Sequence, residues 1–166
     1  LRPLLQQGTP QDRVEEDHFH VFFTTAAATR AEQFSRQGST FSPPIETGAV
    51  LVGALCSCPE TGELFVVVTD AYEVTDAEQK VFSLEYSGRS WARIQSVVKA
   101  RQSVCPALRL LGQAHGHNFL PNGGRTCEAC AQRPKCDLTN LYASEDDGTW
   151  TRATFGGQPW SLCGIY

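Results

Sequence analysis

The stretch Leu108-Arg-Leu-Leu-Gly-Gln-Ala-His-Gly-His-Asn118 joins an apolar run to two histidines, His115 and His117. Its length and composition predict a strand that begins near Leu108. Because strand side chains alternate between faces, the two imidazoles would project from one face, about 6.5 Å apart along the strand. They are a candidate pair of metal ligands, although two surface or hydrogen-bonded histidines at a strand end would show the same spacing. A metal site needs a third ligand, and its chemistry needs a base.

The composition is that of a globular protein with one domain. The chain has 166 residues, of which 41% are hydrophobic and 19% charged, enough for a single substantial core. Its formal net charge is -4. No block of lysine and arginine occurs, which argues against nucleic acid or an anionic membrane surface as a partner. No apolar run is long enough to span a membrane.

The cysteines and the first residues bear on the cellular compartment. Seven cysteines at irregular spacing fit a disulfide framework poorly, so we expect reduced thiols in a cytoplasmic protein. No charged segment leads into an apolar one near residue 1, so no signal peptide is expected. Because the chain contains no methionine, we expect its start to be processed or trimmed, which is compatible with an earlier targeting segment.

Apolar periodicity predicts a mixed sheet with two main helices. Short apolar runs between glycine, proline or polar residues are typical of strands, whereas the stripe of Trp91, Ile94 and Val98 is typical of a helix. We expect strands over 18–23, 45–53, 64–69, 81–86, 108–117, 150–155 and 158–166, and helices over 26–36 and 90–102. Residues 1–17 are expected to form a polar leader before a single domain over 18–166. The fold class is α+β, or a three-layer sandwich, rather than a doubly wound fold.

Acidic residues offer the remaining parts of a metal site. Catalytic zinc takes three protein ligands and leaves a fourth position open for water. Asp147 or Asp146 could supply the third ligand, from the loop that we expect there. Glu46 stands at the start of an apolar strand, where partial burial would raise its pKa toward neutrality and suit it to proton transfer. A strand-edge glutamate that points to solvent is the plainer interpretation of Glu46.

Ser144 begins the sequence Ser144-Glu145-Asp146-Asp147. Ser-x-x-Asp is also a helix-capping pattern, in which the serine accepts a hydrogen bond from the amide three residues later. Taken alone, capping is the better interpretation of this serine.

Three motifs together carry a resemblance to a known family. Glu46 before the glycine-flanked apolar stretch 47–53, then His115-Gly116-His117, then Ser144-x-x-Asp147, resembles the signature of the JAMM (MPN-type, JAB-domain) zinc metalloproteases. The resemblance covers residues 18–166 and implies the cytidine-deaminase-like, MPN-type form of an α+β fold. Each motif is weak alone, and their order makes the combination specific.

The resemblance also implies roles for individual residues. His115, His117 and Asp147 would bind zinc, Glu46 would be the general base, and Ser144 would hydrogen-bond the developing oxyanion. The implied activity is that of a bacterial isopeptidase or peptidase, which deconjugates a ubiquitin-like protein or processes its precursor with metal-activated water. The implied partners are the ubiquitin-like protein, its conjugates, and the activating and conjugating enzymes of the same system. A non-catalytic MPN-type scaffold is the alternative.

The chain departs from the family pattern between the second and third motifs. Residues 118–143 intervene where the family usually has a short stretch, so we expect an inserted loop. The insertion makes Asp146 the nearest substitute for Asp147 as ligand.

The inserted loop contains a cluster of three cysteines, Cys127, Cys130 and Cys136. The cluster is a candidate second, structural zinc site, with Asp137, Cys163 or a histidine as the fourth ligand. Free thiols or a local disulfide would account for it equally well. A zinc nucleoside deaminase also combines His, Glu and Cys-x-x-Cys, but its His-x-Glu would have to be His115-Gly116-His117, which lacks the catalytic glutamate.

Overall fold

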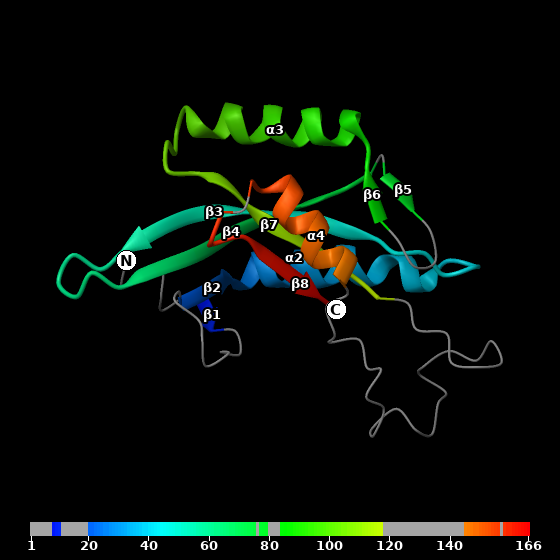
Figure 1. Cartoon of the computed structure of the whole chain (residues 1–166), viewed down its shortest axis with the longest axis horizontal. Coiled ribbons are helices and arrows are strands. Elements are labelled where there is room, and N and C mark those ends of the chain that lie inside the picture. Colours follow the sequence, from blue (N-terminus) through cyan, green and yellow to red (C-terminus); the bar gives the residue numbers. More distant parts are fainter. Residues whose placement is uncertain (1–7, 11–19, 76, 80–83, 118–144, 157) are drawn as a thin grey trace, which may run out of the picture.

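The computed structural model describes residues 8–10, 20–75, 77–79, 84–117, 145–156 and 158–166 (Figure 1). The chain forms, in order, β1 (Gly8–Pro10), β2 (His20–Thr24), α2 (Thr25–Arg36), the 3-10 turn η1 (Gln37–Thr40), β3 (Gly48–Ser57), β4 (Leu64–Glu73), β5 (Ala77–Gln79), β6 (Leu84–Tyr86), α3 (Gly88–Gln102), β7 (Arg109–His115), α4 (Glu145–Thr154) and β8 (Leu162–Ile165). The predicted α+β class is confirmed.

Six of the strands form one mixed sheet in the order β1-β2-β4-β3-β7-β8. The β3–β4 and β3–β7 pairs are antiparallel, and the β2–β4 and β7–β8 pairs are parallel. β5 and β6 form a separate antiparallel pair. The strand that carries His115 therefore lies between β3 and the edge strand β8.

The two predicted helices begin at capping side chains. The Thr24 hydroxyl accepts a hydrogen bond from the Ala27 amide at 3.2 Å, and the Ser87 hydroxyl accepts one from the Ser90 amide at 3.2 Å. Each cap satisfies an amide that has no partner within its own helix. As a result α2 begins directly after β2, and α3 begins directly after the short strand β6.

The sheet is the middle layer of three, with α2 on one face and α3 on the other (Figure 1). Alternate residues of β3 are buried on opposite sides: Ala49 and Leu51 pack toward α2, and Val50 and Val52 pack toward α3. All four are 0% exposed. β3 is therefore covered on both faces, which explains its continuous apolar sequence.

The prediction of a strand over 150–155 is wrong, because α4 covers residues 150–154; among the described residues it is an α-helix in addition to the two expected. Asp147, Trp150, Thr151 and Phe155 recur at the helical spacing of i, i+3, i+4 and i+8, so they share one face of the helix. The three acidic residues in the first turn also favour a helix start through the helix dipole. Threonine, which favours strands, made this period hard to recognise.

Other boundaries differ from the predictions in smaller ways. β3 begins at Gly48, so Glu46 lies in the segment before the strand. β8 is restricted to Leu162–Ile165, and β7 ends at His115, which leaves His117 just beyond it. Within the predicted leader, Gly8–Pro10 pairs with β2 as a short strand. No helix among the described residues is both long and apolar enough to cross a membrane.

Candidate metal centre

His115 is the last residue of β7, where the strand is paired on both sides, and His117 lies just beyond it. His115 is paired with Gly48 of β3 and with Ile165 of β8. The Tyr166 amide donates to the His115 carbonyl at 3.1 Å, and the His117 amide donates to the Tyr166 carbonyl at 3.3 Å. The backbone of both histidines is thus held by hydrogen bonds to β8 and to the residue that follows it.

The glycine between the histidines joins them to the segment that carries Glu46. The Gly116 amide donates to the Thr47 carbonyl at 3.0 Å. Thr47 is itself anchored, because its hydroxyl accepts from the Gly38 amide at 2.8 Å and donates to the Ser35 carbonyl at 3.1 Å. The end of α2, the Glu46 segment and the two histidines therefore form one hydrogen-bonded unit.

The side chains of His115, His117 and Asp147 converge. The two Nε2 atoms lie 2.9 Å apart. Asp147 Oδ1 lies 3.0 Å from Nε2 of His115, and Asp147 Oδ2 lies 3.4 Å from Nε2 of His117. Among the described residues, these three are the group of His, Cys, Asp and Glu side chains that could hold a metal ion.

Asp147 reaches the histidines from the first turn of α4, and not from a loop as expected. Its side chain is 14% exposed. Asp146, the substitute considered from the sequence, is exposed and does not belong to the convergent group. Of the two candidate aspartates, the structure brings Asp147 to the histidines.

The three side chains fit a metal such as zinc. At metal–ligand bonds of about 2.0–2.1 Å, the ligand atoms of a tetrahedral zinc site lie about 3.3 Å apart. One ligand atom from each of the three side chains lies within 4.8 Å of the other two, so small side-chain adjustments would bring them to that spacing. Two imidazole nitrogens and one carboxylate oxygen are a donor set that zinc accepts. Burial lowers the pKa of His115, outweighing the opposing charge of Asp147, and this favours the neutral imidazole that can ligate a metal. Its Nδ1 is buried and has no hydrogen-bond partner in the described part of the chain.

Glu46 is buried beside this centre. It is 8% exposed and precedes Gly48, the strand partner of His115, by two residues. Burial, followed by the negative charge of Asp147, raises the pKa of Glu46 from 4.5 to about 7. The carboxyl group can therefore exchange a proton near neutral pH, as expected for a residue at the mouth of an apolar strand and not for a glutamate that points to solvent.

A buried polar network, which the sequence did not predict, lies next to the convergent group. Gln113 is 5% exposed and shares the face of β7 that carries His115. Its Oε1 accepts from the Tyr86 hydroxyl at 3.0 Å, and its Nε2 lies 3.5 Å from Thr151 Oγ1 and 3.9 Å from Cys163 Sγ. The sequence signal for this network was a polar residue, Gln113, two positions before His115 in an otherwise apolar strand.

Four of the predicted site residues lie outside the described residues: Ser144, Cys127, Cys130 and Cys136. Cys163, a candidate fourth ligand of the cysteine cluster, is in β8 and contacts the Gln113 amide. The four described cysteines, Cys56, Cys58, Cys105 and Cys163, form no disulfide with one another.

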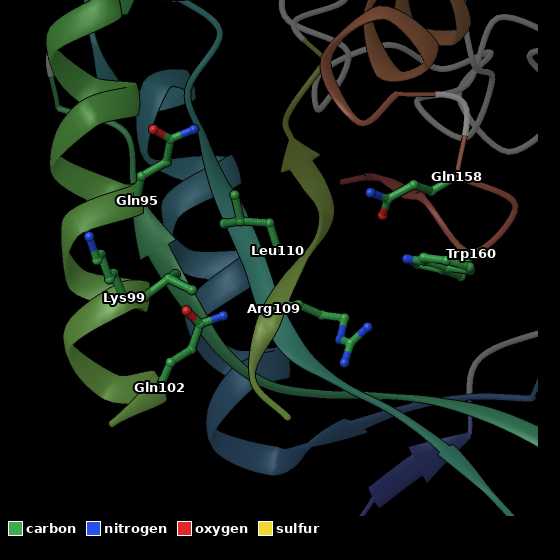
Figure 2. Close-up of a pocket in the computed structure, with 8 residues that line it drawn as sticks. Gln95, Lys99, Gln102, Arg109, Leu110, Gln158 and Trp160 are labelled. Carbon is green, nitrogen blue, oxygen red and sulfur yellow. The ribbon is translucent and has the colours of Figure 1, made fainter. Parts of the chain in front are cut away.

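A separate groove of about 360 Å³ lies toward the other end of β7 (Figure 2). Figure 2 shows Gln95 and Gln102 on α3 at one side of the strand and Gln158 and Trp160 at the other. The groove is lined by Gln95, Val98, Lys99, Gln102, Arg109, Leu110, Gln158 and Trp160. None of the predicted site residues lines it.

No model of a known protein family matches the sequence, and no curated protein matches it significantly.

Proposed function

We propose that the protein is a zinc-dependent isopeptidase or peptidase that cleaves the bond after the carboxyl-terminal tail of a ubiquitin-like protein. One observation carries the proposal: a buried carboxyl group, Glu46, lies beside the convergent side chains of His115, His117 and Asp147. A metal site with an adjacent acid–base group is the minimum equipment for metal-assisted hydrolysis.

The proposed fold is the cytidine-deaminase-like, MPN-type arrangement. A mixed sheet covered by α2 on one face and α3 on the other is compatible with it. So is the order in which the elements supply Glu46 before β3, the histidines at the end of β7, and Asp147 afterwards. The choice of a ubiquitin-like protein as substrate rests on the motif resemblance.

In this proposal Glu46 moves the proton. Its carboxylate would accept a proton from the attacking water and deliver it to the amine nitrogen of the leaving group. In the metal-free protein the pKa of Glu46 is about 7, so the carboxyl group takes up and releases a proton near neutral pH. A zinc ion bound by His115, His117 and Asp147 would polarise the scissile carbonyl and make a coordinated water more acidic. Ser144 remains the proposed oxyanion donor.

Two alternatives are weaker. Two histidines and a carboxylate also suit iron(II), but iron oxygenases require no buried glutamate with a pKa near 7. A non-catalytic MPN-type scaffold would require neither the convergent ligands nor the base.

The proposal also includes a cytoplasmic location and association with the activating and conjugating enzymes of a bacterial modification system.

Glu46→Gln tests the proposal, because it removes the proton carrier without removing a ligand. With the fluorogenic carboxyl-terminal amides of ubiquitin and of bacterial ubiquitin-like proteins, we expect kcat/KM to fall by about 100-fold or more, with zinc content unchanged. Glu60→Gln, at an exposed turn, is the matched control and should leave both kcat/KM and the zinc content unchanged. If Glu46→Gln cleaves as fast as the wild type, or if the wild type cleaves none of the amides, the proposal is wrong.

A further inference from the structure

We infer that Gln113 is a positioning residue, which holds α4 in the orientation that presents Asp147 to the two histidines. The inference rests on the metal-binding part of the proposed function. It assigns Gln113 no contact with the metal or the substrate.

The three candidate ligands are held in different ways. His115 lies in a strand that is paired on both sides, and His117 is hydrogen-bonded to the residue after β8. Asp147 instead depends on the placement of α4, which belongs to no sheet. A helix with its side chains has a radius of about 5–6 Å, so a rotation of about 20° moves a side-chain oxygen by about 2 Å. Such a rotation would remove Asp147 from the histidines.

Aromatic packing holds α4 near the sheet and constrains its rotation only loosely. Trp150 meets Tyr86 edge to face at a centroid distance of 4.7 Å, and Phe155 meets Trp91 at 5.9 Å. Edge-to-face pairs occur over a range of centroid distances of about 4.5–7 Å, and the hydrophobic part of the contact is non-directional, so this packing constrains the helix less tightly than a hydrogen bond does.

Gln113 provides a directional contact between β7 and α4. Thr151 lies one helical turn after Asp147 and is therefore on the same face of α4. It is 8% exposed, and its hydroxyl lies 3.5 Å from Nε2 of the Gln113 carboxamide and also hydrogen-bonds the Cys163 thiol of β8. The same carboxamide accepts from the Tyr86 hydroxyl at 3.0 Å, which fixes its own orientation. One buried side chain thus connects the strand of His115 to the helix of Asp147.

A double-mutant cycle on zinc affinity tests this role. Zinc affinity is measured by competition with a chromophoric chelator for the wild type, Gln113→Leu, Asp147→Asn and the double variant. We expect Gln113→Leu to weaken binding by about 10- to 100-fold, the range for residues that orient metal ligands. In the Asp147→Asn background the same change should cost less than about 3-fold, because the ligand that Gln113 positions is already lost. Zinc bound elsewhere on the chain contributes equally to all four proteins, so it cancels when their zinc affinities are compared.

Two further measurements separate the positioning of Asp147 from a general loss of stability: the cobalt(II) spectrum, and the comparison of two substitutions of Thr151. The cobalt(II) spectrum of Gln113→Leu should resemble that of Asp147→Asn, because both lose the carboxylate ligand. Thr151→Ser keeps the hydroxyl and should bind zinc as the wild type does, whereas Thr151→Val should not. Asp70→Asn, which removes ion pairs of β4 that do not involve the centre, should lower stability without changing zinc affinity.

Several results would overturn the inference: an equal loss of affinity in both backgrounds, no loss at all, or a wild type that binds no zinc. If Gln113→Leu does not fold, Thr151→Val removes the same contact from the α4 side, together with the contact of Thr151 to Cys163, and unchanged affinity in that variant would overturn the inference. A wild type that shows the predicted coupling but cleaves no ubiquitin-like amide would overturn the proposed function and leave this inference standing.

Discussion

At the scale of single residues, the centre depends on a glycine between its histidines. A Cβ added to Gly116 would lie 2.1 Å from the Ser35 carbonyl oxygen, at the end of α2. No side chain fits there without a shift of the backbone that carries both imidazoles. The middle position of His115-Gly116-His117 is therefore determined by packing against α2.

We predict that Gly116→Ala lowers both stability and zinc affinity. The added methyl group must displace backbone, which costs about 1–3 kcal/mol for overpacking of this kind. Thermal unfolding and zinc titration measure the two effects. Gly88→Ala is the matched control, because a Cβ there meets nothing within 4 Å. A Gly116→Ala protein that matches Gly88→Ala in both measurements would show that the close approach is not real.

Glu46 makes the stability of the metal-free protein depend on pH. Its folded-state pKa of about 7 lies above the ordinary 4.5, so the folded state binds more protons than the unfolded state between these values. The resulting contribution to stability is complete below pH 4.5 and is lost as the pH rises to about 7.

We therefore predict that Glu46→Gln stabilises the metal-free protein at pH 8 and not at pH 4. The expected gain at pH 8 is about 3 kcal/mol as an upper estimate, because the neutral amide avoids the cost of a buried charge. Denaturant unfolding in the presence of a chelator measures it. A Glu46→Gln protein no more stable than the wild type at pH 8 would mean that the carboxylate is solvated.

At the scale of the elements, Asp70 of β4 connects two helices. Its Oδ1 lies 2.5 Å from Arg30 of α2, and its Oδ2 lies 2.6 Å from Arg101 of α3. Burial alone would raise the pKa of Asp70, but hydrogen bonds from Arg101, Arg30 and the Ala71 amide together hold it below its usual range. The carboxylate thus ties the outer layers of the fold to the sheet.

We predict that Asp70→Asn lowers the free energy of unfolding by about 1–2 kcal/mol at pH 7, since both arginines are half exposed and partly screened. A lowered folded-state pKa stabilises the protein above the unfolded-state value of 3.8, and this contribution is lost as the pH falls below it. Denaturant unfolding at pH 7 and pH 3 checks both points. A difference from the wild type that persists unchanged at pH 3 would assign the effect to packing and not to charge.

Elements with a local signal were predicted correctly from the sequence, and α4 was not. α2 has an alanine-rich sequence and a threonine cap, and the β3–β4 hairpin has two continuous apolar runs around a glycine turn. These signals act over a few residues. α4 is stabilised by contacts of Trp150 and Phe155 with Tyr86 and Trp91, which are distant in the sequence. Propensity alone therefore favoured a strand there.

At the scale of the whole molecule, the candidate centre is assembled from three separate parts of the chain. Antiparallel pairing of β3 with β7 places Gly48 opposite His115, which brings Glu46 to the histidines. α4 then brings Asp147 to them. The sequence predicted these residues because each stands in a short motif. It left Asp146 as a substitute for Asp147 and did not show what Gln113 contacts, because both depend on how α4 packs against β7.

The metal content of two proteins tests the central claim most directly. Zinc per chain is measured by mass spectrometry for the wild type and for the variant that carries both His115→Asn and His117→Asn. Zinc held by any other part of the chain is common to both proteins and cancels in the difference. If these histidines and Asp147 form the metal centre, the wild type holds one equivalent of zinc more than the variant. Equal zinc content in the two folded proteins would contradict it.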